Sequence, residues 1–170
     1  MNLKEKIREI ADYPKEGIGF KDITTLLQDG PAFKQAIQQL ADKFRDAKVD
    51  VIVGPEARGF LIGAPLAFEL GVGFVPVRKQ GKLPGETISC EYQLEYGTDV
   101  LEMHKDSIKP NENVLIVDDL LATGGTINAT VDMVRKSGAN VIGLGFLIEL
   151  TFLEGRKNFT GIEVLSLIQY

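Results

Sequence analysis

The chain has 170 residues, 44% of them hydrophobic, and a net charge of −5, which is the size and composition of one compact globular domain. Its acidic balance argues against a general nucleic-acid binder, which would carry a basic stripe. Cys90 is the single cysteine, so an internal disulfide is excluded and a reducing compartment is favoured. No apolar leader begins the chain and no run approaches ~18 apolar residues, so we expect a cytoplasmic protein without membrane contact.

The N-terminal part of the chain is predicted to hold two helices joined by a turn-rich link. Residues 3–10 have helical spacing, with Leu3, Ile7 and Ile10 on one face. Residues 13–17 contain a proline and a glycine and end this element. A second helix is predicted from about residue 31 to residue 44, because proline is tolerated in a first turn and apolar residues then recur at helical spacing.

Strands and helices alternate in the rest of the chain. Short apolar runs bounded by loops are typical of buried strands, and the segments between them have helical spacing. This alternation predicts an α/β fold in which a parallel sheet carries helices on both faces. The predicted strands are 49–53, 74–77, 114–117, 140–148 and 163–168; the predicted helices are 60–70 and 127–136, with a short helical piece near 151–157.

An insertion of about residues 78–112 interrupts the alternation. Its first part, 78–87, is a loop without apolar periodicity, and two β-like stretches, 88–94 and 98–103, follow. Long insertions of this kind often act as lids, so we expect a flap over the carboxyl edge of the sheet. The basic cluster Arg78, Lys79 and Lys82 is either an anion-binding group or an ordinary solvated loop.

The most informative segment is 114–126, an apolar strand followed by Asp118, Asp119 and a loop of small residues. Backbone N–H groups at the start of the next helix favour a phosphate, and glycines let it approach closely. The two carboxylates would repel a phosphate, so they suit ribose hydroxyls. No lysine follows the glycines, so this is not an ATP-binding loop, and with His104 as the only histidine a multi-histidine metal site is impossible.

This segment is similar to the phosphoribosyl-pyrophosphate (PRPP) binding motif of type I phosphoribosyltransferases. Three other segments, 13–27, 54–60 and 78–97, extend the resemblance to the adenine phosphoribosyltransferase family, and the order of elements agrees over nearly the whole chain. One departure is Lys21, where the family commonly has arginine, which weakens stacking of a guanidinium on a base.

The resemblance implies a single phosphoribosyltransferase domain over residues 1–170, with an N-terminal hood of about residues 1–30. It also implies the reaction adenine + PRPP ⇌ AMP + pyrophosphate in a homodimer. Magnesium would be carried by PRPP oxygens and water, without a dedicated protein metal site. The reaction builds positive charge on the sugar and negative charge on the leaving group, so basic groups should gather at the pyrophosphate and carboxylates near the ribose.

Roles for individual residues follow from the motifs and the resemblance together. Glu95 is predicted to be the catalytic residue, exchanging a proton with the purine N7 when the flap closes, and the Glu56–Ala57 peptide bond is expected to be cis. The ribose-phosphate is assigned to Asp118, Asp119, Ala122, Thr123, Gly124, Gly125 and Thr126; pyrophosphate to Arg58, Arg78, Lys79 and Lys82; the base to Phe20, Lys21, Tyr96 and Leu150, with Ala122 beside it.

Other functions remain open at this stage. Enzymes for 6-oxopurines usually carry an aspartate where this chain has Ala122, and a xanthine enzyme or one for another purine is less clearly excluded. A PRPP-sensing regulator without turnover would normally add a DNA-binding segment, for which 170 residues leave no room. A flavodoxin-like nucleotide-binding module would leave the flap unexplained.

Overall fold

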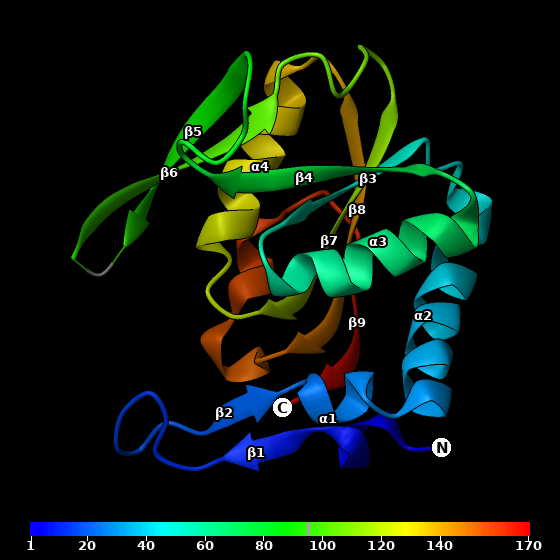
Figure 1. The fold of residues 1–170 in the computed structure, drawn as a ribbon, viewed down its shortest axis with the longest axis vertical. Helices are drawn as coiled ribbons and strands as arrows, with labels where there is room; N and C mark the ends of the chain where they lie inside the picture. Colours follow the sequence, from blue (N-terminus) through cyan, green and yellow to red (C-terminus); the bar gives the residue numbers. More distant parts are fainter. Residues whose placement is uncertain (95) are drawn as a thin grey trace.

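A central sheet organises the protein (Figure 1). Within residues 1–94 and 96–170, which the computed structural model describes, seven strands lie in the order β5-β6-β4-β3-β7-β8-β9. The run from β4 to β9 is parallel, and β5 and β6 join it antiparallel at one edge. The strands are β3 (Val51–Pro55), β4 (Gly73–Lys79), β5 (Thr87–Leu94), β6 (Gly97–His104), β7 (Asn113–Leu121), β8 (Asn140–Glu149) and β9 (Val164–Gln169).

Helices cover both faces of this sheet, as predicted. Helices α2 (Gly30–Phe44) and α3 (Arg58–Leu70) pack on one face and α4 (Gly125–Lys136) on the other. The strands alternate accordingly, since Ile52 joins the apolar cluster under α2 and α3 while its neighbours in β3 join the cluster under α4. None of the helices in the described ranges is both long and apolar enough to cross a membrane.

The N-terminal segment differs from the sequence prediction. Residues 3–10, predicted as one helix, form a 3₁₀ turn at Leu3–Lys6 and a strand, β1 (Arg8–Ile10), which pairs antiparallel with β2 (Phe20–Asp22). A short helix, α1 (Thr24–Leu27), follows. The pairing is fixed by Asp22, which accepts hydrogen bonds from Thr24 and Arg8 that hold its pKa at about 2. We call residues 3–27 the hood.

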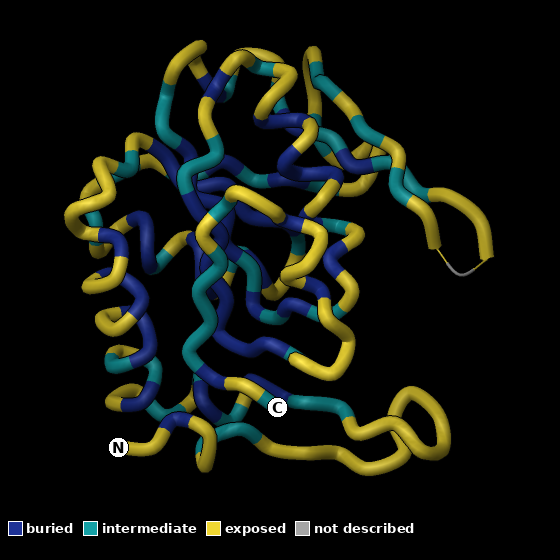
Figure 2. Tube along the Cα trace, turned by 180° about the vertical axis from the view of Figure 1, so that it is seen from behind, coloured by how far each residue is buried: buried dark blue, intermediate teal, exposed yellow. Residues whose placement is uncertain are grey.

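The strands β5 and β6 form a hairpin that continues the sheet. They pair from Thr87 and His104 to Leu94 and Gly97, and β6 pairs with β4 through Arg78 and Lys79. These two basic residues were expected in a loop, but they form the end of β4, which lies between β6 and β3 in the sheet. The loop is confined to residues 80–86. The hairpin and the loop between β1 and β2 project from the same side of the molecule (Figures 1 and 2). The loop is exposed, whereas the hairpin is exposed mainly at the strand ends farthest from the sheet and is partly buried elsewhere.

Strand β7 is longer than predicted and includes Asp118 and Asp119. Both carboxylates had been expected just after the strand, but β8 keeps pairing with β7 up to Leu121. The short helical piece predicted between β8 and β9 is present as two 3₁₀ helices, at Thr151–Leu153 and Gly155–Asn158.

Candidate functional site

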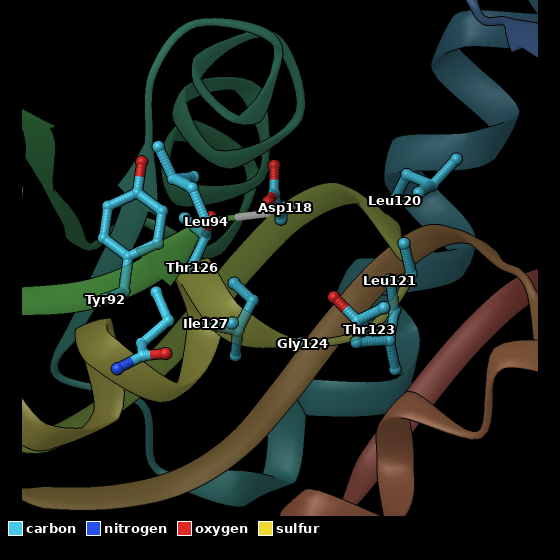
Figure 3. Close-up of a pocket in the computed structure, with 12 residues that line it drawn as sticks. Tyr92, Leu94, Asp118, Leu120, Leu121, Thr123, Gly124, Thr126 and Ile127 are labelled. Atoms are coloured by element: carbon cyan, nitrogen blue, oxygen red, sulfur yellow. The ribbon is translucent and has the colours of Figure 1, made fainter. Parts of the chain in front are cut away.

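The loop from β7 to α4 forms the floor of a cavity of about 200 Å³ (Figure 3). Gly124 precedes the helix with φ of +91°, a conformation that glycine adopts without strain. The first N–H groups of α4 have no partner within the helix, so the end of the loop is suited to an anion. The cavity is lined by Tyr92, Gln93 and Leu94 of the hairpin, by Asp118, and by residues 120–127.

The acidic pair lies at the edge of this cavity. Asp119 is buried and accepts a hydrogen bond of 2.8 Å from Arg58 Nε, while its own N–H donates to Asp118 at 2.8 Å. Burial, and then the neighbouring charge of Asp119, raise the pKa of Asp118 well above its ordinary value. The two carboxyl groups are therefore unequal, since Asp119 has a cationic partner and Asp118 has none at ion-pair distance within residues 1–94 and 96–170.

Arg58 is the first residue of α3, and Gly59 allows this helix to approach β7. A Cβ at Gly59 would lie 2.8 Å from Asp118 Oδ1, closer than real side chains come. The Arg58 guanidinium also lies 5.5 Å from the centre of the Phe20 ring in the hood. The start of α3 thus links the hood to the acidic pair.

A second cavity, of about 350 Å³, adjoins the first on the side of β3 and α3. Both are lined by Asp118, Leu120 and Thr126. The rest of its lining is Glu56, Ala57, Arg58 and Asp119. The expected cis peptide bond between Glu56 and Ala57 is present.

The basic residues assigned to pyrophosphate do not gather at one point. Lys82 Nζ donates to Glu56 at 2.6 Å, and Arg78 Nε lies 3.4 Å from the same carboxylate, whereas the Lys79 ammonium lies 3.8 Å from Asp99. Burial would raise the pKa of Glu56, but the hydrogen bonds from Lys82 and the Lys79 N–H outweigh it and lower the pKa. Arg58 alone of the four faces the acidic pair.

The residues assigned to the base are spread over three elements. Phe20 is half-buried in the hood, and Leu150 donates its N–H to Leu121 beside the phosphate loop. Lys21 is engaged elsewhere, since it pairs with Glu9 at 2.9 Å and lies over the Tyr170 ring. Tyr96, on the hairpin, is 92% exposed, so it does not pack against the other members of the set. Glu95, the predicted catalytic residue, lies outside the described residues.

The sequence analysis missed the support behind the phosphate loop. Asn158 Nδ2 donates to the Thr123 carbonyl oxygen at 2.8 Å, and the buried Phe159 ring packs under Gly124. Gly155 packs against Ala122 so closely that a Cβ would come within 2.3 Å of its carbonyl oxygen. These contacts join segments more than thirty residues apart in the sequence. The glycine at position 155 was the one local feature that could have indicated a close approach between them.

Comparison with known proteins shows the family to which the chain belongs. Residues 24–168 match the family model of the phosphoribosyl transferase domain. An adenine phosphoribosyltransferase of Clostridium botulinum is 61% identical over 100% of this chain and 99% of its own length. The chain belongs to the adenine phosphoribosyltransferase family.

Solved structures of this family superpose closely on the protein. The adenine phosphoribosyltransferase of Thermoanaerobacter pseudethanolicus has a TM-score of 0.95 and 58% identity, covering 99% of this chain and 98% of that one. The Saccharomyces cerevisiae enzyme, solved in complex with an imino-altritol bisphosphate and adenine, has a TM-score of 0.91 and 42% identity, covering 96% of this chain and 95% of its own. The family's parallel sheet with helices on both faces is thus confirmed.

Proposed function

We propose that the protein transfers the 5-phosphoribosyl group from PRPP to adenine, giving AMP and pyrophosphate. The observation that carries this proposal is the pair of adjoining cavities that meet at Asp118, Leu120 and Thr126. One has an anion-binding helix N-terminus as its floor and the other contains Arg58. A sugar with a phosphate at one end and a pyrophosphate at the other fits this arrangement, with the ribose at the acidic pair between them.

Each end of PRPP then meets groups of suitable charge. The N–H groups and hydroxyls of residues 123–126 bind the 5′-phosphate. Arg58 provides a planar donor group for pyrophosphate oxygens. Arg78, Lys79 and Lys82 are assigned to the same anion, and of these Arg78 and Lys82 contact Glu56, which lines the second cavity. Asp118 and Asp119 accept hydrogen bonds from the ribose hydroxyls.

The same arrangement suits the charge that develops during the reaction. As the bond to pyrophosphate breaks, the ribose becomes cationic, and carboxylates beside it stabilise this state more than the ground state. When PRPP is bound with magnesium, the metal would neutralise part of the negative charge on the leaving pyrophosphate. The ligands of the metal would be PRPP oxygens and water, so Asp118 and Asp119 remain free to accept from the ribose hydroxyls.

For the base, we propose a site between the hood and the loop that follows β8. Phe20 provides an apolar face in the hood, and Ala122 and Leu150 belong to the phosphate loop and to the segment hydrogen-bonded to it. Lys21 would have to leave Glu9, and Tyr96 would have to approach the base, to join them. Glu95 is proposed to exchange a proton with the purine N7. Ala122 carries no charged group to pair with a 6-oxopurine, and the named relatives favour adenine.

A homodimer is the proposed assembly. On α3, Leu61 and Phe68 are seven residues apart and therefore share a helix face, and they are 46% and 88% exposed. Phe68 also borders an apolar groove of about 290 Å³ between α2 and α3. Large exposed apolar side chains on one face are typical of an interface. The cytoplasmic location stays a prediction from the sequence.

Product formation tests the proposed function directly. The protein is incubated with PRPP, magnesium and one purine at a time, and pyrophosphate and nucleotide are measured. We expect AMP with adenine and far less product with hypoxanthine, guanine or xanthine. Binding of PRPP without release of pyrophosphate would indicate a sensor, and turnover with xanthine alone would reassign the base.

A further inference from the structure

The segment between β8 and β9 supports three consecutive residues of the phosphate loop. It packs on Ala122 through Gly155, hydrogen-bonds the Thr123 carbonyl through Asn158, and lies under Gly124 through the Phe159 ring. Asn158 itself is exposed. Its amide is therefore a polar contact at the surface, made to the backbone of the loop by a residue that does not line the ligand cavity.

An ion pair between the buried Glu149 and the exposed Arg156 anchors this segment. Glu149, at the end of β8, is 2% exposed and accepts hydrogen bonds from both Arg156 Nε and Nη2, at 2.8 and 2.5 Å. Ser166 of β9 donates to the same carboxylate at 2.7 Å. The hydrogen bonds from Arg156 are the main reason that the pKa of Glu149 is lowered, so the pair stays ionised at neutral pH. Asn158 thus belongs to a segment that is held against β8 by the contacts of Arg156 with Glu149.

The contact with Asn158 determines which way one peptide group faces. In a planar trans peptide the carbonyl and the following N–H point in opposite directions. Because the Thr123 carbonyl points toward Asn158, the Gly124 N–H points in the opposite direction, and Gly124 lines the cavity. In the part of the chain that the structure describes, this N–H has no acceptor. With φ of +91°, Gly124 has the freedom to let the peptide turn over if the contact is lost.

We propose that Asn158 is a positioning residue for the phosphate loop. Its side-chain amide keeps the N–H of the Thr123–Gly124 peptide, and not the carbonyl oxygen, facing the 5′-phosphate. This inference rests on the proposed function, because it requires a phosphate in the first cavity. Pyrophosphate is bound in the second cavity, by Arg58 on a different element, and does not depend on this peptide.

Binding measurements on two variants test the proposal. AMP and magnesium pyrophosphate are titrated separately into the parent protein, Asn158→Ala and Asn158→Asp by calorimetry. One neutral hydrogen bond is worth ~1 kcal/mol, so Asn158→Ala should weaken AMP about 5- to 10-fold. Asn158→Asp should weaken it further, because a carboxylate cannot donate and repels the carbonyl. Lys157→Ala is the control, since Lys157 is exposed and pairs only with its neighbour Glu154 among the described residues.

The outcomes separate the inference from the function on which it rests. Weaker AMP binding with unchanged pyrophosphate binding supports the positioning role. Unchanged AMP affinity in both variants, with a parent that binds AMP, would overturn it and leave the proposed function intact. An equal loss for AMP and pyrophosphate would also overturn it, because this would be general damage to the fold. A parent that binds neither compound would overturn the proposed function itself.

Discussion

The carboxyl group of Asp118 is held where ionisation is unfavourable. It is partly desolvated at the edge of the two cavities and lies beside Asp119, whose charge is balanced by Arg58. Because its pKa is raised in the folded protein, the folded state takes up this proton more readily than the unfolded chain. The stability contribution of Asp118 is therefore fully present below its ordinary pKa of 3.8 and is lost as the pH rises through the raised value. At neutral pH an ionised Asp118 opposes folding.

We therefore predict that Asp118→Asn stabilises the empty protein and weakens ligand binding. The asparagine keeps an oxygen for the Asp119 N–H and removes the repulsion between two acids. The melting temperature at pH 7 should rise by several degrees, with a smaller rise at pH 5. The affinity for AMP should fall, because a hydrogen bond from the ribose to a charged acceptor, worth ~1.5–3 kcal/mol, is lost. Asp132→Asn, on the exposed face of α4, should change neither. A lower melting temperature would show that Asp118 stabilises the fold.

Gly124 and Gly125 require different substitutions as tests of the phosphate loop. Gly124 has positive φ and a Cβ there would meet Phe159, so any side chain strains the protein itself. At Gly125 the added Cβ would meet no atom within 4 Å and φ is not positive. Only Gly125 therefore reports on the ligand without disturbing the loop.

Gly125→Val is expected to block the 5′-phosphate while leaving the fold intact. Its branched side chain would project where an anion must approach the helix N-terminus, so AMP and PRPP affinities should fall ~10-fold or more, equal to ~1.4 kcal/mol. Gly30→Val is a matched control, because Gly30 is also the first residue of a helix and also has open space at its Cβ. If calorimetry gives equal affinities for Gly125→Val and the parent, the loop is only a turn.

The catalytic assignment of Glu95 is tested by separating chemistry from binding. Glu95→Gln keeps the size and one acceptor but removes the ability to take a proton. We predict that kcat falls ~10²-fold or more while PRPP affinity changes little, as expected for an interaction made in the transition state. Glu91 is an exposed residue of β5, so Glu91→Gln should leave kcat nearly unchanged in the same steady-state assay. Retention of more than about half of the parental kcat would mean that water or the substrate handles the proton.

At the scale of elements, the loop of residues 80–86 is held more firmly than its composition suggests. The sequence predicted a loop without apolar periodicity, and polar contacts restrain it instead. Glu56 accepts from the Lys79 N–H at 2.7 Å and from Lys82, and Glu102 accepts from the Gly81 N–H at 2.6 Å. Glu56 thus occupies basic groups that PRPP would use. Pyrophosphate must compete with this carboxylate or bind beside it.

Hydrogen exchange of residues 79–87 measures this restraint. Glu56→Gln removes the charge that Lys82 contacts, so hydrogen exchange of these residues in the empty protein should become about 5-fold faster or more. A larger effect is not required, because Lys82 is partly exposed and exposed ion pairs are weak. Glu86→Gln is the control, because Glu86 is exposed and contacts only Lys105 at 3.7 Å among the described residues. Equally slow exchange in both variants would mean that Glu102 and the strand pairing are sufficient.

Local patterns predicted most elements, and contacts between distant segments decided the rest. The strands of the sheet and helices α2, α3 and α4 follow from apolar periodicity, because each buries one face. Residues 3–10 have the same helical spacing, but Arg8 binds Asp22 and the chain there pairs as a strand. No local signal reports a partner fourteen residues away.

In the candidate site, too, the sequence predicted the residues that are near one another in the chain but not the contacts between distant segments. Asp118, Asp119 and the glycine loop lie together because they are consecutive, and Arg58 joins them because adjacent parallel strands end at one edge. The ion pair of Lys82 with Glu56 and the hydrogen bond of Asn158 to Thr123 connect residues far apart in the sequence. Such contacts depend on the packing of whole elements, so they required the structure.

For the whole molecule, the exposed face of α3 predicts how two copies associate. A symmetric dimer would bury Phe68 in both copies, and burying one such side chain contributes ~1.5–3 kcal/mol, so the pair contributes roughly 3–6 kcal/mol. Phe68→Lys should therefore raise the dimer dissociation constant at least ~100-fold. The fold should be kept, because Phe68 is 88% exposed.

Sedimentation velocity over a range of protein concentrations makes this measurement. The parent should sediment as a dimer and Phe68→Lys as a monomer at low micromolar concentration. Phe152→Lys replaces another exposed aromatic residue, 70% exposed on the 3₁₀ turn after β8, and should leave the dimer intact, because it does not lie on α3. A Phe68→Lys protein that remains dimeric would place the interface on another surface, and a parent that is monomeric at every concentration would exclude the homodimer.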